Sequence, residues 1–519
     1  MNQNNGKNQI IYLFIIAAIL LFAGLGSSPI YILDEARNAQ CAREMMENND
    51  WLLPTFNAEL RAHKPPMHYY FIRFGYSIFG TNEFGARFFS AVTGFLTLLI
   101  TFYFTKKYVS KLVALIAVAF LLSSVHFLFE FRLAVPDPYL IFFTVLVFFA
   151  FFEYVQSRKF LYLLIAAIAT GLAILTKGPV ALALPALSIF IWLLWERKLK
   201  ILLSWKMIVA FVIVCLVAVP WYWLIHKATN GVFTQEFFFT HNLNRFSDTM
   251  EGHGGIFLLV PLFVIVGMLP GSVFMGEAFK KIRKEKNVSL IKLAAVVVTV
   301  FVVFYSTSNT KLPNYPMPCY PFAAILLAYG AEQFFNASKR MKQYPFFILL
   351  FINLILPVGA YFAIRIEPAL KGMEWIAAGL IILPVTATIA FYKNRKSGFR
   401  PAMNFLFAGY MIFNLIFLVV LYPAAYKKNP VTTSLHLINP DKQVYAYEIY
   451  NPAFNFYLNK PVKEFKDTAQ LYSALSKDTA GIIITRLNLL GALDSTKYKI
   501  VTSKRDLFET PTTVLLKLK

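Results

Sequence analysis

Acidic and basic side chains gather in a long polar segment near the amino terminus, residues 28–85. It carries the adjacent acids Asp34 and Glu35, then Arg37, and later His63 and Lys64 directly before two prolines. A carboxylate can take a proton from an attacking hydroxyl group, and a lysine can bind a phosphate through its charge. The segment therefore has the residue types for chemistry on a substrate with an anionic head group.

Three later segments carry further groups of this kind. Asp137 stands between two prolines, His241 and Arg245 lie in the string THNLNRF, and Lys311 and Tyr315 lie in SNTKLPNYP. We expect these segments to meet the first one at a single membrane face. There the cations would bind an anionic head group, and apolar helices would hold a lipid tail.

The elements that must position these groups are membrane helices. Of the 519 residues, 58% are hydrophobic and only 15% are charged, which is typical of a polytopic membrane protein. An uncharged apolar run of about 18 residues can cross the bilayer as a helix. The sequence predicts thirteen such spans: 9–28, 86–105, 109–128, 137–155, 160–176, 180–195, 205–225, 255–276, 290–306, 316–333, 345–364, 374–392 and 402–422.

The distribution of positive charge predicts the topology. The net charge is +23, and the basic residues cluster in short loops between apolar runs. Such loops are typically cytoplasmic, so the excess of basic residues indicates orientation and no nucleic-acid partner. With thirteen spans, all the basic loops fall on one side. The amino terminus is then cytoplasmic, and residues 28–85 lie outside.

The last part of the chain changes character. Residues 1–423 are predicted to form the membrane domain, and residues 424–519 a small extracytoplasmic α/β domain. Within the latter, β-rich runs begin at Val444, Gly481 and Thr513, and residues 467–475 have helical spacing of apolar positions. The three cysteines show no spacing typical of a disulfide framework or a metal site.

Several of these side chains also have a purely structural interpretation. Asp34 precedes a helical stretch, residues 35–46, and Asp137 precedes a span, so either acid could be a helix N-cap. Lys64 and Lys311 could anchor the chain at the membrane interface. Lys177, in the string TKGP, could merely end a helix, and His63 and His241 could be ordinary interfacial residues.

Several motifs occur together in order. They are D-E-x-R-x-A, E-M, D-W-x-x-P, K-P and F-G-x-N-E-F-x-x-R, followed by VPDP, TKGP, HNLNRF and KLPNYPMP. This series resembles the signature of the bacterial lipid A aminoarabinose transferases. That family belongs with the protein O-mannosyltransferases among the C-type glycosyltransferases, which use lipid-phosphate sugars. The resemblance is good over residues 10–330 and weak beyond them.

The resemblance implies a fold and roles for individual residues. Helices of the first outer loop would lie on the membrane surface over a cavity, with Asp34 and Asp137 as the active-site acids. Glu35, Arg37 and His241 would support them. The donor phosphate would be bound by Lys64, Arg245, Lys311 and Tyr315.

The resemblance leaves metal dependence open. Aminoarabinose transferases usually have Glu where this chain has His63, and a divalent metal has been proposed there with a histidine matching the His241 region. His63 and His241 could still bind Zn²⁺, because imidazole is a good zinc ligand. Mg²⁺ or Mn²⁺, or no metal at all, are the other possibilities.

The predicted function is a single inverting displacement at the periplasmic face of a bacterial inner membrane. A sugar would pass from a polyprenyl phosphate to lipid A or another glycolipid, among the surrounding membrane lipids. A protein O-mannosyltransferase-like enzyme is one alternative. A lipid flippase or transporter is another, but it predicts charges at span centres and an internal repeat, and neither is evident. A structural scaffold leaves the ordered first-loop motifs unexplained.

Overall fold

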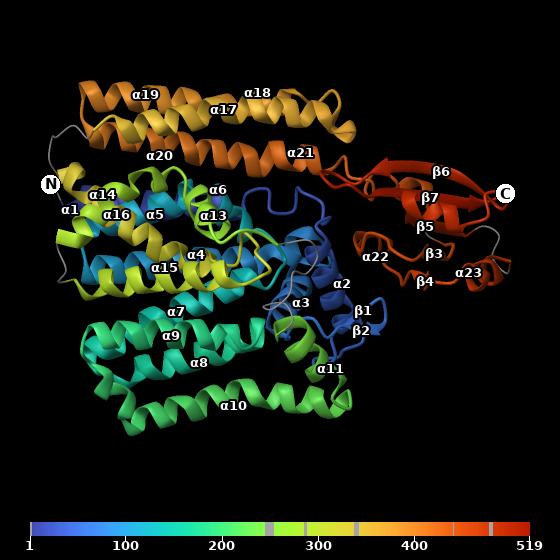
Figure 1. Ribbon diagram of the computed structural model, residues 1–519, viewed down its shortest axis with the longest axis horizontal. Coiled ribbons are helices and arrows are strands. Elements are labelled where there is room, and N and C mark those ends of the chain that lie inside the picture. The colour runs from blue at the N-terminus through green and yellow to red at the C-terminus, as the bar shows by residue number, and fades with distance from the viewer. Residues whose placement is uncertain (1–2, 244–253, 285–287, 337–341, 440, 477–480) are drawn as a thin grey trace.

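A computed structural model describes residues 3–243, 254–284, 288–336, 342–439, 441–476 and 481–519. A helical part, which holds two short strands, is followed by a mixed sheet with two helices (Figure 1). The helices in the first part of the chain, up to residue 284, are α1 (Gln3–Phe22), α2 (Leu33–Glu47), α3 (Met67–Phe79), α4 (Glu83–Tyr108), α5 (Lys111–Ser123), α6 (Val125–Glu130), α7 (Asp137–Ser157), α8 (Phe160–Lys177), α9 (Val180–Trp195), α10 (Trp205–Ala228), α11 (Val232–Gln235), α13 (Leu259–Gly267) and α14 (Met275–Lys284). The remaining helices are α15 (Ser289–Thr307), α16 (Tyr320–Asn336), α17 (Tyr344–Ile366), α18 (Trp375–Ala378), α19 (Ile382–Lys396), α20 (Phe399–Ile416), α21 (Tyr422–Tyr426), α22 (Ala453–Leu458) and α23 (Thr468–Leu475).

The helical part is a multi-pass membrane bundle. Within the described residues, eight helices are long and apolar enough to cross a membrane, or nine if one bent pair is a single span. A helix lies in each of the thirteen predicted ranges, but the count of thirteen spans stays a prediction. The range 255–276 is not one straight helix, because the chain bends by 105° between α13 and the segment that begins at Gly271.

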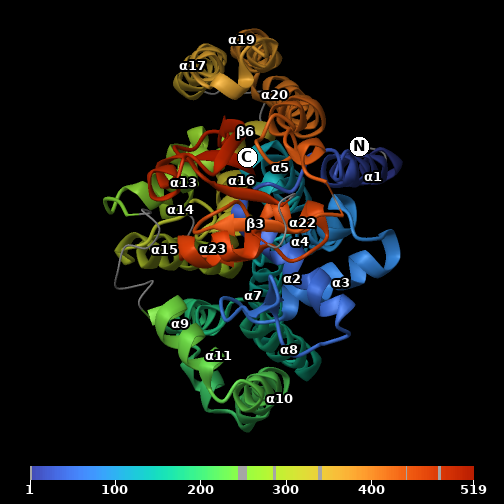
Figure 2. The same cartoon turned by 90° about the vertical axis from the view of Figure 1, so that its right-hand side faces the viewer.

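The bundle has an interior helix and lipid-facing helices. In the most apolar 18-residue stretch of each helix, 89% of the residues are buried in α7, 22% in α10 and 17% in α17. A helix that is apolar on all sides is stable either inside a bundle or against lipid. Figures 1 and 2 show α10 at one edge of the bundle and α17 with α19 at the opposite edge. The buried α7 therefore belongs to the protein core, and the outer helices face the hydrocarbon.

Ion pairs join the helix ends that carry the predicted cytoplasmic loops. Lys107 at the end of α4 contacts Glu153 near the end of α7 at 2.7 Å, and Lys292 at the start of α15 contacts Glu196 after α9 at 2.7 Å. The opposite ends of α4 and α7, which begin at Glu83 and Asp137, adjoin the first loop. The two ends of the bundle thus differ, although which end faces the cytoplasm stays a prediction.

The first loop folds into two helices and a small hairpin at the end of the bundle that carries the sheet (Figure 1). The predicted helix at residues 35–46 is confirmed by α2, and β1 (Thr55–Phe56) pairs with β2 (Glu59–Leu60). The α3–α4 corner is tight. A Cβ on Gly75 would lie 2.0 Å from the backbone oxygen of Gly85, so only glycine fits there.

The sequence from Val444 onward forms a five-stranded sheet in the order β4-β3-β5-β7-β6, which confirms a small C-terminal α/β unit. Its strands are β3 (Val444–Tyr447), β4 (Lys463–Phe465), β5 (Ile482–Arg486), β6 (Tyr498–Arg505) and β7 (Thr512–Leu518). The strand β3 runs parallel to β4 and β5, and β7 is antiparallel to its neighbours. The sheet lies across the end of the bundle, in front of α2 in Figure 2.

Candidate active site

Asp34 lies at the exposed start of α2. It is the second residue of the helix, the N-cap is Ile32, and no side chain caps this end. The interpretation of Asp34 as the N-cap is therefore wrong. A carboxylate in the first turn of a helix is stabilised by the helix dipole and by the nearby free backbone N–H groups. The Asp34 carboxylate is exposed in this turn and therefore accessible to a substrate.

Glu35, predicted to support the site, has a clear structural position. Its carboxylate is buried and accepts two hydrogen bonds from Arg87. Arg87 Nε donates to Oε1 at 2.7 Å, and Arg87 Nη2 donates to Oε2 at 2.8 Å. The carboxylate also accepts from the backbone N–H of Ala134 at 2.9 Å. Arg87 donates in addition to backbone oxygens of the first loop, including that of Ser28 at 2.7 Å. One buried ion pair thus joins α2, α4 and the loop before α7.

Asp137 forms the second polar cluster. It is the first residue of α7, Pro136 occupies the N-cap, and no side chain caps that end, so the N-cap interpretation of Asp137 is also wrong. Its Oδ1 lies 2.6 Å from Nζ of Lys177 at the last residue of α8. The same Nζ lies 4.8 Å from the ring centroid of Tyr315. Lys177 therefore does more than end a helix, a role that its position in TKGP alone did not indicate.

Glu130, an acid of the string EFRLAVPDP to which the sequence assigned no role, belongs to this cluster. Burial, together with the neighbouring charge of Asp137, raises the pKa of Glu130, whereas Lys177 acts in the opposite direction. Two carboxylates and one ammonium group thus share a buried position, so Glu130 retains its proton more readily than an exposed glutamate.

The residues around the K-P motif place two cations in the first loop, Arg61 and Lys64. Lys64 is half-buried and His63 is exposed. Burial and the charges of Arg61 and Lys64 lower the pKa of His68, which is therefore neutral. Arg61 is buried, donates to the Tyr69 hydroxyl at 3.3 Å and interacts electrostatically with Asp34. Arg61 was also not singled out from the sequence, because nothing local distinguishes it from a surface arginine.

The remaining predicted residues lie in three different situations. Lys311 is buried and donates through Nζ to the backbone oxygen of Ser308. Arg37 is half-buried on α2. Arg245 and the side chain of His241 lie outside the described residues, so their predicted contacts remain predictions.

No metal site is evident among the described residues. Within residues 3–243 and the later described ranges, no three His, Cys, Asp or Glu side chains are grouped so that they could hold a metal ion. His63 therefore lacks a described set of co-ligands. Binding of Zn²⁺, Mg²⁺ or Mn²⁺ by His63 with His241 stays a prediction.

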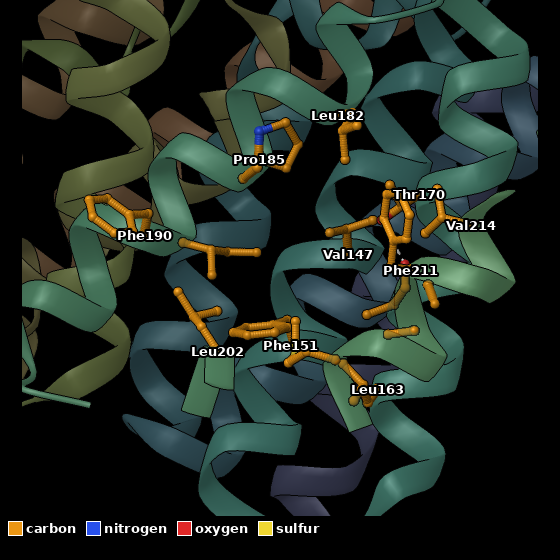
Figure 3. A pocket seen from close by; sticks show the side chains of 16 residues that line it. Val147, Phe151, Leu163, Thr170, Leu182, Pro185, Phe190, Leu202, Phe211 and Val214 are labelled. Atoms are coloured by element: carbon orange, nitrogen blue, oxygen red, sulfur yellow. Dashed lines mark hydrogen bonds between the residues drawn. The ribbon is translucent and has the colours of Figure 1, made fainter. Parts of the chain in front are cut away.

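An apolar cavity lies between α7, α8, α9 and α10 and is partly open at the surface of the bundle, since its lining residues Leu182, Phe190 and Phe211 are exposed. Its volume is about 410 Å³, and it is lined by side chains of α7, α8, α9 and α10 and of the α9–α10 connection (Figure 3). Thr170 is its one hydroxyl-bearing residue, and that hydroxyl donates to the Ala166 backbone oxygen at 2.8 Å. On α8, Thr170 lies about 10 Å before Lys177, given the rise per residue of an α-helix. The cavity can hold an apolar chain, and about 10 Å separates its nearest lining residue on α8 from Lys177.

Comparison with known proteins identifies the family. Residues 11–231 match the family model described as dolichyl-phosphate-mannose-protein mannosyltransferase. An uncharacterized protein of Aquifex aeolicus (strain VF5) is 31% identical over 355 residues, which are 68% of this chain and 79% of that protein. The chain belongs to this family of membrane glycosyltransferases. The resemblance stated from the motifs is thereby confirmed.

Two further relatives of the glycosyltransferase family carry names. A Pseudomonas fluorescens (strain Pf0-1) protein, named undecaprenyl phosphate-alpha-4-amino-4-deoxy-L-arabinose arabinosyl transferase 2, is 27% identical over 85% of this chain and 78% of its own length. The crystal structure of ArnT from Cupriavidus metallidurans bound to undecaprenyl phosphate superposes with a TM-score of 0.79 and 20% identity. That match covers 98% of this chain and 97% of the other. The fold is therefore shared along almost the whole chain.

The Asp137–Lys177 pair leads to a first prediction. Replacing Lys177 by methionine leaves Asp137 buried without its cation, so the free energy of unfolding should fall by about 1–3 kcal/mol. The double variant Lys177→Met/Asp137→Asn should recover most of this loss, since neither charge remains. Thermal unfolding in detergent, monitored by tryptophan fluorescence, measures the stability of both variants. Equal midpoints for the single and double variants would contradict the pairing.

Proposed function

We propose that the chain transfers 4-amino-4-deoxy-L-arabinose from undecaprenyl phosphate to lipid A at the periplasmic face of a bacterial inner membrane. Membership of the glycosyltransferase family supplies the reaction class. The donor is inferred from the name of the Pseudomonas fluorescens relative. The observation that carries the proposal is the meeting of Asp137, Lys177 and Tyr315 from three separate segments, at the ends of two helices that also line an apolar cavity.

The donor is proposed to bind with its tail in the apolar cavity and its phosphate at the ends of α7 and α8. Lys64, Lys311, Arg245 and the Lys177 ammonium are the cations proposed to act on it. As the bond from the sugar to the phosphate breaks, negative charge develops on the leaving phosphate oxygen. Fixed cations stabilise that charge more in the transition state than in the ground state. Tyr315 is proposed to hold Lys177 in position from the side opposite Asp137.

Asp34 is proposed to act on the acceptor. A carboxylate that is accessible at the start of a helix can accept a proton from an attacking hydroxyl group. If the acceptor is a phosphate of lipid A, that group is already ionised, and Asp34 then acts mainly by orienting it. In either case the acceptor attacks the face of the sugar opposite the phosphate, which inverts the configuration at the anomeric carbon.

Deletion of the gene in its native host tests the acceptor. Mass spectrometry of lipid A should show the loss of a pentosamine increment, and a plasmid copy of the gene should restore it. The match to a protein mannosyltransferase family model suggests a second candidate acceptor, a periplasmic protein. In that case the deletion would remove a hexose from glycosylated periplasmic proteins. Unchanged lipid A together with altered proteins would overturn the proposed acceptor but leave the reaction class intact.

A further inference from the structure

A second polar pocket lies away from the Asp34 and Asp137 clusters, between the first loop and the C-terminal sheet unit. It has a volume of about 360 Å³ and lies where the end of α2, the α3–α4 turn and α22 meet. Pockets of about 300–1,000 Å³ are typical of small-ligand sites. Its walls include Arg43, Glu47, Glu83, Tyr457 and Asn459.

One wall of the pocket is the buried Arg43 side chain, of which one nitrogen has no hydrogen-bond partner among the described residues. Arg43 is only 5% exposed, and its Nη1 donates to the Phe456 backbone oxygen at 2.7 Å and to Asn459 Oδ1 at 2.8 Å. Its guanidinium also lies 4.6 Å from the centroid of the Phe456 ring. Its Nε, however, has no hydrogen-bond partner among the described residues. A buried donor of this kind is stabilised when a ligand supplies an acceptor.

The charges of the pocket limit the kind of ligand. One guanidinium faces two carboxylates, Glu47 on the exposed rim and Glu83, whose Oε1 accepts from the Tyr457 hydroxyl at 2.8 Å. A phosphate or other anion would be repelled by this excess of negative charge. Hydroxyl and ammonium groups would be favoured, because carboxylates accept strong hydrogen bonds from both.

We propose that this pocket binds a saccharide unit of the amino-sugar type. Carboxylates, an amide and an aromatic residue together match the hydroxyls, the ammonium group and the apolar face of such a ring. Arg43 follows Asp34 by nine residues, or about 14 Å along α2, so the saccharide lies about two or three sugar units from Asp34. The proposal rests on the proposed function for the acceptor's identity, and it assigns the pocket to the sugar part of that acceptor.

Binding of a soluble sugar to the full-length protein in detergent tests the proposal. We expect saturable binding of a glucosamine disaccharide by isothermal titration calorimetry, without any donor present. Glu47→Gln should weaken it about tenfold, since one hydrogen bond to a charged group is lost. Thr81→Trp should abolish it by filling the pocket. Glu59→Gln, an exposed acid in the same loop, is the matched control and should bind normally.

Several outcomes overturn the proposal. They are no saturable sugar binding, binding that neither Glu47→Gln nor Thr81→Trp weakens, and tighter binding of inorganic phosphate than of the disaccharide. Failure of the proposed function looks different. In that case the disaccharide binds and responds to these variants, while no sugar transfer to lipid A is detected.

Discussion

The variant Asp34→Asn is expected to lower sugar transfer by about 10²–10⁴-fold while donor binding is retained. A loss of this size is expected whether Asp34 orients a phosphate acceptor or takes the proton from a hydroxyl acceptor. Asparagine has nearly the same shape, and Asp34 is exposed in the first turn of α2 without a capping role, so the fold should be unaffected. Turnover of a labelled polyprenyl-phosphate sugar in membranes measures the effect.

The control for Asp34 is an acid of the same loop that has no proposed role. Glu59 is exposed in β2, and Glu59→Gln should leave turnover within about twofold of wild type, in line with other surface substitutions. Near-normal turnover of Asp34→Asn beside an unchanged control would remove Asp34 from the reaction.

The variant Arg87→Met is expected to lower the free energy of unfolding by about 3–5 kcal/mol. The side chains of Arg87 and Glu35 are 3% and 1% exposed. Removal of one partner therefore leaves the charge of the other buried without compensation. The Arg87 bonds to the backbone oxygens of Leu25, Ser28 and Pro29 are lost as well. Denaturant titration of the protein in detergent micelles measures the change.

Two controls separate this effect from a general loss of charge. Lys497→Met removes an exposed pair with Asp494, in which the two side chains are 54% and 43% exposed, and should leave the unfolding midpoint unchanged. The double variant Glu35→Met/Arg87→Leu should recover part of the loss, since replacing both partners by apolar groups removes the buried charge. An Arg87→Met protein as stable as Lys497→Met would contradict the structural role of the Glu35–Arg87 pair.

The helices could be predicted from the sequence because apolar length is a local property. A helix lies in every predicted span, and α2 agrees with its predicted range within two residues at each end. The bend between α13 and α14 was missed, since hydropathy does not report direction. In the C-terminal unit, β3, β5 and β7 were predicted from their apolar runs. The strands β4 and β6 were missed, because β4 has only three residues and most side chains of β6 are polar and exposed.

The candidate site could be predicted only in its residue types. The motifs indicated Asp34, Asp137 and Lys64, but which carboxylate meets which cation depends on contacts far apart in the chain. Glu35 and Arg87 are 52 positions apart, and Asp137 and Lys177 are 40 apart. Glu130 is distinguished only by its burial and by the charge of Asp137. Such pairings require the tertiary packing of helices, which no local pattern contains.

Transfer by the purified protein tests the central claim most directly. The full chain is reconstituted in liposomes with lipid A and undecaprenyl phosphate carrying labelled aminoarabinose, with Asp34→Asn as the control. One labelled pentosamine per modified phosphate of lipid A is expected with wild type, at a rate at least about 10²-fold higher than with Asp34→Asn. Movement of the labelled donor across the bilayer without any labelled lipid A would contradict the central claim and would indicate a transporter.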